Sequence, residues 1–185
     1  MNERAFHDLE LRTECTLDAS AENNAHPMPK SECRNTGIHH VGLHSKDPAA
    51  SAAFYCDILG MQVVGGSGPE HPLGSTEFLT SRPDEESHEI ALFANPMFAH
   101  IALKVSSLAE FRLMYAHVVE RNIPIKYVFN RGVSFAFYFD DPDGHTIEVY
   151  WPTGTLDSYR QPYAQTLDLT QPDEVLLEQL ARGPA

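Results

Sequence analysis

Several short segments that alternate apolar and polar residues carry the side chains best suited to bind a divalent metal. GIHHVGLH carries His39, His40 and His44, FAHIALKV carries His100, and HTIEVYW carries Glu148. Imidazole nitrogens and carboxylate oxygens both bind divalent ions. Two histidines with one carboxylate suit non-haem Fe(II) in particular, because three protein ligands leave further positions open for substrate and O₂.

Strand alternation predicts which of these side chains share a face. Successive residues of a strand point to opposite sides of the sheet, so His40 leaves one face while His39 leaves the other with the apolar residues. By the same alternation, His100 and Glu148 point away from the apolar side of their strands. If the apolar sides pack on helices, we expect His40, His100 and Glu148 to converge on the free face. His44 shares that face nearer the rim and is a candidate pocket residue.

We do not expect the other histidines to share the strand face on which His40, His100 and Glu148 converge. A single histidine is more often a hydrogen-bonded residue of the surface or rim than a metal ligand, and we expect that role for a set of five. These are His39, His71, His88, His117 and His145.

An internal repeat positions the candidate ligands. HVGLHSKDPAASAAFY begins at His40 and HIALKVSSLAEFRLMY begins at His100. In each copy the histidine opens an alternating strand, and a helix N-cap follows. Asp47 precedes a proline in the first copy, whereas Ser107 has capping-box spacing with Glu110 in the second.

The remainder of each copy predicts three more strands. Gly60 and Asn122 are natural helix ends. Strand-like runs then cover about 62–64, 76–80 and 89–94 in the first half, and 125–129, 133–140 and 146–151 in the second. The sequence therefore predicts an α+β fold of two tandem βαβββ modules.

The segment DDPDGH predicts a tight hairpin between the last two strands. Pro142, Asp143 and Gly144 suit a type I turn closed by a left-handed glycine. Counting back along the strands from this turn places Tyr138 directly across from Glu148. We therefore expect Tyr138 on the ligand face, with the phenylalanines that alternate with it in the core.

Composition narrows the classes of protein. The 185 residues are 42% hydrophobic and lack an apolar run long enough to span a membrane, and the first residues do not form a secretory signal. A net charge of −13 argues against nucleic acid and anionic membrane surfaces as partners. Three scattered cysteines rule out a disulfide framework or a thiolate zinc site. We expect a soluble, cytoplasmic protein that acts on a small molecule, and a homodimer or larger homo-oligomer is left open.

The repeat occupies the middle of the chain. We expect a flexible N-terminal arm over residues 1–35, a domain over 36–152 with modules of about 36–95 and 96–152, and a C-terminal tail over 153–185. The stretch DEVLLEQLA predicts a short amphipathic helix in that tail.

The segments GIHHVGLHSKDPAASAAFYCDILGMQVV, FAHIALKV and FYFDDPDGHTIEVYW resemble the vicinal oxygen chelate superfamily, which includes glyoxalase I, bleomycin-binding proteins and extradiol dioxygenases. The resemblance covers about residues 36–152 and is strongest to single-domain proteins of the catechol 2,3-dioxygenase type. It implies two modules that form a cup-shaped mixed sheet.

The resemblance also implies an activity and a site. The activity is extradiol cleavage of a catechol-type vicinal diol by O₂, in aromatic catabolism. His40, His100 and Glu148 would bind Fe(II), with Mn(II), Ni(II) and Zn(II) as alternatives. Tyr138 would match the tyrosine that hydrogen-bonds the substrate's iron-bound oxygen.

One position departs from the pattern of the catechol 2,3-dioxygenase branch of this superfamily. Its members usually carry a catalytic histidine in the loop before the tyrosine strand, and here FNRGVSF places Arg131 there. An arginine stays protonated near neutral pH and cannot act as a general base. It can still stabilise a bound catecholate, so binding of a diol is better supported than ring cleavage itself.

Three other functions share part of this pattern. A glyoxalase I-type isomerase (lactoylglutathione lyase) would use four protein ligands around Ni or Zn, with Glu89 as the candidate fourth. A thiol transferase acting on a phosphonate would want several cations, for which Lys104, Lys126 and Arg131 are the candidates. A metal-free binding module is the non-enzyme alternative, and the intact ligand set argues against it.

Overall fold

The computed structural model describes residues 34–153 and 164–182 of the chain. Residues 1–33, nearly all of the expected N-terminal arm, lie outside the described residues. The elements in chain order are β1 (Gly37–His44), α1 (Pro48–Leu59), β2 (Gln62–Ser67), β3 (Thr76–Thr80), β4 (Ile90–Phe93), the short 3₁₀ helix η1 (Pro96–Phe98), β5 (His100–Lys104), α2 (Leu108–Glu120), β6 (Ile125–Asn130), β7 (Ser134–Asp140), β8 (Thr146–Pro152), β9 (Gln165–Thr166) and α3 (Asp173–Arg182).

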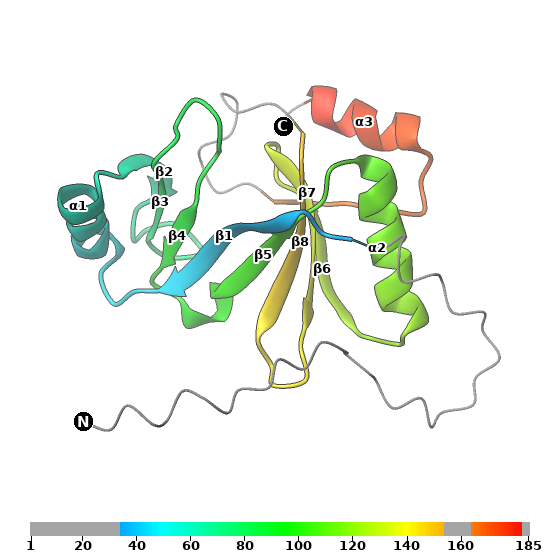
Figure 1. Cartoon of the computed structure of the whole chain (residues 1–185), viewed down its shortest axis with the longest axis horizontal. Coiled ribbons are helices and arrows are strands. Elements are labelled where there is room, and N and C mark those ends of the chain that lie inside the picture. Colours follow the sequence, from blue (N-terminus) through cyan, green and yellow to red (C-terminus); the bar gives the residue numbers. More distant parts are fainter. Residues whose placement is uncertain (1–33, 154–163, 183–185) are drawn as a thin grey trace, which may run out of the picture.

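Two βαβββ modules share one mixed sheet, in the order β2-β3-β4-β1-β5-β8-β7-β6-β9 across the described residues (Figure 1). Within the modules β1 pairs with β4, and β5 with β8, in parallel. Antiparallel pairing of β1 with β5 joins the two modules at the centre. The α+β fold of two tandem modules is confirmed.

Helix ends follow the capping signals in the sequence. The Asp47 side chain accepts a hydrogen bond from the Ala50 N–H at 3.1 Å, and Ser107 accepts one from the Glu110 N–H at 3.1 Å. Gly60 ends α1 with φ of 65° and Asn122 follows α2 with φ of 57°. The capping residues that the sequence predicted therefore lie at the ends of both helices.

The larger hydrophobic core belongs to the second module. Phe111 of α2 packs against Phe135 and Phe137 of β7, and all three side chains are fully buried. Leu176 of α3 joins this cluster, so the short C-terminal helix covers the same module. The phenylalanines of β7 thus face the core as expected.

The hairpin between β7 and β8 sets the register that the site needs. Gly144 has φ of 85° and its N–H donates to the Asp141 carbonyl at 3.0 Å. Tyr138 pairs directly with Glu148. The predicted turn and the cross-strand pair are both confirmed.

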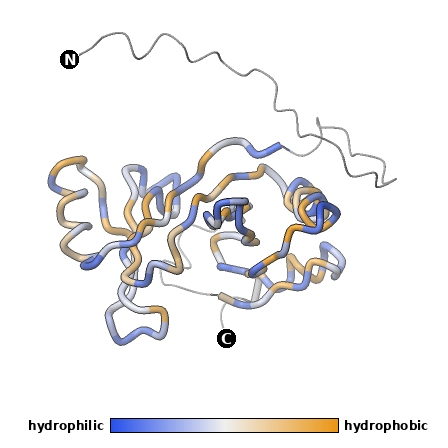
Figure 2. The backbone as a smooth tube through the Cα atoms, turned by 90° about the horizontal axis from the view of Figure 1, so that it is seen from below, coloured by the Kyte–Doolittle hydropathy of each residue, from blue (hydrophilic) through white to orange (hydrophobic). Residues whose placement is uncertain are grey.

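The expectation that helices cover the apolar side of β1 and β5 is wrong. Ile38 is 68% exposed, Leu43 38% and Ile101 40%. The reason is that α1 packs against β2, β3 and β4 while α2 packs against β8, so that within the described residues neither helix covers the centre of the sheet between them. Hydrophobic and hydrophilic residues are interspersed along the backbone of the described residues (Figure 2). In the described part of the chain, no helix is long and apolar enough to cross a membrane.

Candidate active site

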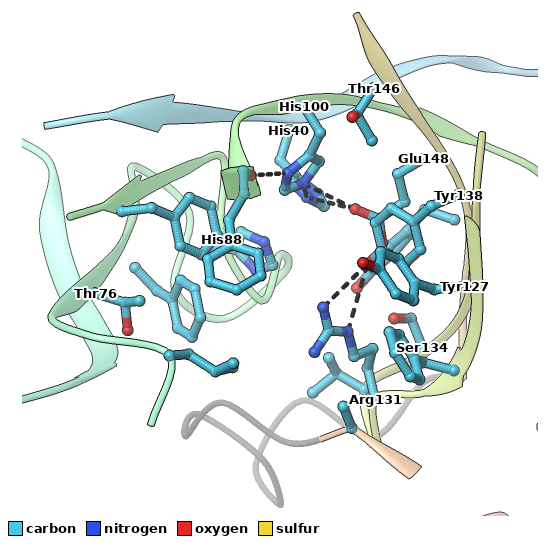
Figure 3. A pocket seen from close by; sticks show the side chains of 18 of the residues that line it. His40, Thr76, His88, His100, Tyr127, Arg131, Ser134, Tyr138, Thr146 and Glu148 are labelled. Carbon is cyan, nitrogen blue, oxygen red and sulfur yellow. Dashed lines mark hydrogen bonds and ion pairs between the residues drawn. The ribbon is translucent and has the colours of Figure 1, made fainter. Parts of the chain in front are cut away.

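His40, His100 and Glu148 meet on the concave side of the sheet, from β1, β5 and β8 (Figure 3). The two Nε2 atoms lie 2.9 Å apart, and Glu148 Oε2 lies 3.2 Å from His40 Nε2 and 2.9 Å from His100 Nε2. Metal bonds of about 2.1 Å at right angles would separate neighbouring donor atoms by about 3 Å. The triangle therefore has the size of one face of an octahedral site.

The Nδ1 atom of each imidazole has a hydrogen-bond partner on the side away from the triangle. The Nδ1–H of His100 donates to the Phe98 carbonyl at 2.6 Å, which leaves the Nε2 lone pair for the site. The Nδ1 of His40 lies 2.7 Å from the Nδ1 of His39. When His40 is the donor in this contact, its Nε2 lone pair also faces the site.

Electrostatics keep the carboxylate charged. Burial alone would raise the pKa of Glu148, but His40 and His100 hold it well below its usual range. Burial lowers the pKa of His40. Burial would also lower the pKa of His100, but its hydrogen bond to Glu148 raises it above the ordinary value.

Gly42 makes room for the second histidine. A Cβ at this position would lie 2.5 Å from Nδ1 of His100 and 3.0 Å from the Phe93 ring. Any larger residue would displace the imidazole from its carbonyl partner. The glycine in HVGLH is thus required for the geometry of the ligand on the neighbouring strand.

The three donor atoms border a cavity of about 400 Å³. Its surface is mostly apolar and comes from both modules, with seven Phe and Tyr side chains among the lining residues, which suits a flat, apolar ligand. The aromatic side chains that line it, apart from the tyrosines of β7 and β8, are Phe78, Phe93, Phe98, Tyr127 and Phe129.

Tyr138 and Arg131 form a pair in the cavity wall (Figure 3). Nε and Nη2 of Arg131 lie 3.4 and 3.3 Å from the Tyr138 hydroxyl, and the guanidinium carbon lies 5.1 Å from the centre of the Phe129 ring. Burial raises the pKa of Tyr138 although Arg131 opposes this, so the phenol remains protonated. The pair presents a hydroxyl and a cation beside the ligand triangle.

His88 is a cavity residue that the sequence reasoning missed. Its ring centre lies 4.2 Å from that of His40 and 5.0 Å from that of Phe78, and its Nδ1 lies 3.1 Å from Ser87 Oγ. Burial and the neighbouring imidazoles hold the pKa of His88 well below its usual range, so the ring is neutral at neutral pH. If strand alternation extended back from Ile90, the His88 side chain would point to the helix side of the sheet. The strand β4 begins only at Ile90, so alternation does not apply to His88.

His39 was also assigned to the wrong face. The pairing of β1 with β5 shifts register between Ile38 and His40, which is the signature of a β-bulge. The bulge turns His39 to the same side as His40, where its ring stacks on Tyr150 at 4.0 Å. No turn residue in the sequence signals this irregularity.

Glu89, the alternative fourth ligand, lies away from the triangle. Its carboxylate accepts hydrogen bonds from the Ser81 N–H at 2.6 Å and from Arg82 Nη2 at 2.9 Å. The first-module counterpart of Glu148 is Ala91, because Ala91 pairs with Gly42 as Glu148 pairs with Ala102. The expected proximity of Glu89 to that position is wrong, and a methyl group occupies it.

Other candidate residues take peripheral positions. His44 is exposed and does not line the cavity. Lys126 lines it, but its Nζ lies 2.7 Å from Asp140 Oδ1. Lys104 lies 3.4 Å from Glu86. The cluster of cations expected for a phosphonate site is therefore not assembled by these lysines.

Fold and site together define a protein of the vicinal oxygen chelate class, with paired modules around a concave face that carries the potential ligands. Residues 37–149 match the Glyoxalase/Bleomycin resistance protein/Dioxygenase superfamily, and the chain belongs to this superfamily.

Relatives within the superfamily differ in activity. The chain is 28% identical over 139 residues to biphenyl-2,3-diol 1,2-dioxygenase 3 of Rhodococcus globerulus, covering 69% of this chain and 66% of that protein. It is 31% identical over 124 residues to lactoylglutathione lyase of Salmonella typhimurium, covering 60% of this chain and 88% of that protein. The solved 2,2',3-trihydroxybiphenyl 1,2-dioxygenase of Sphingomonas wittichii matches with a TM-score of 0.55 at 20% identity, over 71% of this chain and 51% of that one, and shows the fold alone.

Proposed function

We propose that the protein is an Fe(II)-dependent extradiol dioxygenase that opens the ring of a catechol-type vicinal diol with O₂. The observation that carries the proposal is the compact triangle of His40, His100 and Glu148 at the edge of an aromatic cavity. The relative from Rhodococcus globerulus, a biphenyl-2,3-diol dioxygenase, supports this class of substrate. Mn(II), Ni(II) and Zn(II) remain alternative metals in this proposal.

The donor set fits a metal that needs open coordination positions. His40, His100 and Glu148 would hold the ion with three donor atoms, which would leave further coordination positions for exogenous ligands. Ala91 supports this count, because its methyl group cannot serve as a fourth ligand at the position that mirrors Glu148. A bound divalent ion would lower the pKa of the diol hydroxyls and bring the diol and O₂ together.

Tyr138 and Arg131 supply polar contacts for the oxygen atoms of the diol. The phenol of Tyr138 is protonated and donates a hydrogen bond to a substrate oxygen held at the triangle. Arg131 stays charged and fixes that phenol from the other side, with its nitrogens 3.3 and 3.4 Å from the hydroxyl. Together they stabilise a negatively charged catecholate in an apolar cavity.

His88 supplies the base that Arg131 cannot. It is neutral at neutral pH and belongs to the cavity wall, beside His40 but outside the ligand triangle. When the Nδ1–H of His88 donates to Ser87 Oγ, Nε2 is unprotonated and can accept a proton from a diol hydroxyl. In this proposal His88 takes the role of the histidine that the dioxygenase branch carries at the position of Arg131.

Purification without oxygen, followed by metal analysis and oxygen-electrode assays, tests the proposal. The Fe(II)-loaded protein is offered catechol, substituted catechols and biphenyl-2,3-diol. We expect oxygen uptake together with a yellow ring-opened semialdehyde. His100→Ala is the negative control, because it removes one corner of the triangle and should abolish Fe(II) binding.

The lactoylglutathione lyase relative defines the second arm of the experiment. The protein loaded with Ni(II) or Zn(II) is given methylglyoxal and glutathione. Turnover in this arm without oxygen uptake in the first would replace the dioxygenase with an isomerase. Ring cleavage of a catechol, together with no turnover of methylglyoxal and glutathione, would exclude the isomerase activity.

A further inference from the structure

A second layer of side chains lies behind His40, the member of the triangle that the first module provides. The β-bulge in β1 turns two consecutive histidines to the concave side, so His39 sits directly behind His40. Their Nδ1 atoms are 2.7 Å apart, and Nε2 of His39 lies 2.9 Å from Glu86 Oε2. We propose that the His39–Glu86 pair is a positioning device that orients the ligand His40 and raises the affinity of the site for its metal.

When His40 acts as a ligand, only one arrangement of protons satisfies both hydrogen bonds, the one between His40 and His39 and the one between His39 and Glu86. The Nε2 of His40 must then be unprotonated, so its Nδ1–H donates to Nδ1 of His39. His39 consequently carries its proton on Nε2 and donates it to the Glu86 carboxylate. The tautomer of the ligand is thus fixed by a carboxylate two hydrogen bonds away.

The pair is itself held in place. The His39 ring stacks on Tyr150 with 4.0 Å between centres and 20° between planes, and its side chain is 2% exposed. The Tyr150 hydroxyl lies 3.1 Å from Ser87 Oγ. Glu86 is 18% exposed and lies 3.4 Å from Lys104 Nζ. The stack on Tyr150 restricts the motion of His39, and the ion pair with Lys104 restricts the motion of Glu86.

The second histidine ligand is held differently. His100 donates through Nδ1 to the Phe98 backbone carbonyl, which no substitution of a side chain removes. The orientation of His40, by contrast, depends on side chains alone. A change at position 39 should therefore affect one ligand of the site and leave the other in place.

Co(II) binding under anaerobic conditions tests the role directly, because its visible bands report ligand geometry without any turnover. His39→Phe keeps a ring for stacking on Tyr150 and removes the acceptor. His39→Asn keeps a carbonyl oxygen near the position of Nδ1 and loses the contact with Glu86. Glu86→Gln keeps the acceptor and removes its charge, and His145→Phe is the control at an exposed histidine.

We expect His39→Phe to weaken Co(II) binding by about 10- to 100-fold with a changed visible spectrum. Glu86→Gln and His39→Asn should lose less than His39→Phe, and His145→Phe should match the wild type. The metal-free His39→Phe protein should melt close to the wild type.

Two results would overturn the proposal. One is wild-type affinity and spectrum in His39→Phe. The other is equal loss of metal-free stability and of affinity in His39→Phe and His39→Asn, which would assign the pair to packing. The inference rests on the ligand triangle of the proposed function but not on ring cleavage. A protein that binds Co(II) in the expected order yet does not cleave catechols would keep the positioning role, whereas a wild type that binds no Co(II) would remove both.

Discussion

Polar groups in the cavity divide into the proposed metal ligands and the residues proposed to transfer protons. His40, His100 and Glu148 meet within hydrogen-bond distance of one another. Tyr138 and His88 stand beside them without joining the triangle. Because the two sets are distinct, substitutions should separate metal binding from turnover.

His88→Gln should slow ring cleavage by about 10²- to 10⁴-fold, because the neutral imidazole is the proposed acceptor of the diol proton. Metal content should remain that of the wild type, since His88 is not a ligand. Steady-state oxygen uptake and metal analysis on the same preparation give both quantities. His117→Gln on α2 is the matched control, and an unchanged rate in His88→Gln would remove the base from the proposal.

Tyr138→Phe should lower kcat by about 10²-fold with little effect on metal content, because it removes one hydrogen bond to the reacting oxygen and keeps the ring. The comparison of kcat with KM decides whether the phenol acts on the reaction or on binding. A rise in KM alone would make Tyr138 a binding residue only.

At the scale of elements, the sequence predicted what depends on regular alternation and failed where the backbone is irregular. The Tyr138–Glu148 pair followed from turn chemistry and strand register. His39 was placed on the wrong face because a bulge shifts β1 by one residue, and a bulge without a glycine or proline leaves no signal in the sequence. His88 was missed because it precedes β4, where alternation no longer holds.

Glu89 joins the end of β3 to the start of β4, and its substitution should affect stability and not metal binding. Burial alone would raise its pKa, but hydrogen bonds from Ser81, Arg82 and Thr80 lower the pKa to about 2. Folding therefore favours the charged form of Glu89. The resulting stabilisation of the folded state is fully present above about pH 4.5 and is lost as the pH falls toward 2.

Glu89→Gln should therefore cost about 1–2 kcal/mol at pH 7, because charged hydrogen bonds are replaced by neutral ones. Urea denaturation at pH 7 and at pH 3 should show a difference between variant and wild type that shrinks at the lower pH. Fe(II) binding should stay nearly intact. Loss of binding equal to that of His100→Ala would restore Glu89 as a fourth ligand.

At the scale of the whole molecule, the proposed metal would join the two modules. The first module provides His40, and the second provides His100 and Glu148. The central β1–β5 pairing brings them together, while among the described residues neither α1 nor α2 has its main contacts with these two strands. A metal bound by His40, His100 and Glu148 would connect the two modules, whose helices α1 and α2 pack on separate parts of the sheet.

Metal binding should accordingly raise the stability of the whole chain. A ligand at about 100 times its Kd stabilises the folded state by about 2.7 kcal/mol, and for a chain of this size each kcal/mol moves Tm by about 2–4 °C. We expect an increase of about 5–10 °C when Fe(II) or Mn(II) is added anaerobically, reversed by a chelator. His100→Ala should melt at the same temperature with and without metal, while Glu89→Gln starts lower and keeps the full increase. An equal increase in His100→Ala would place the bound metal elsewhere on this acidic protein, whose net charge is −13.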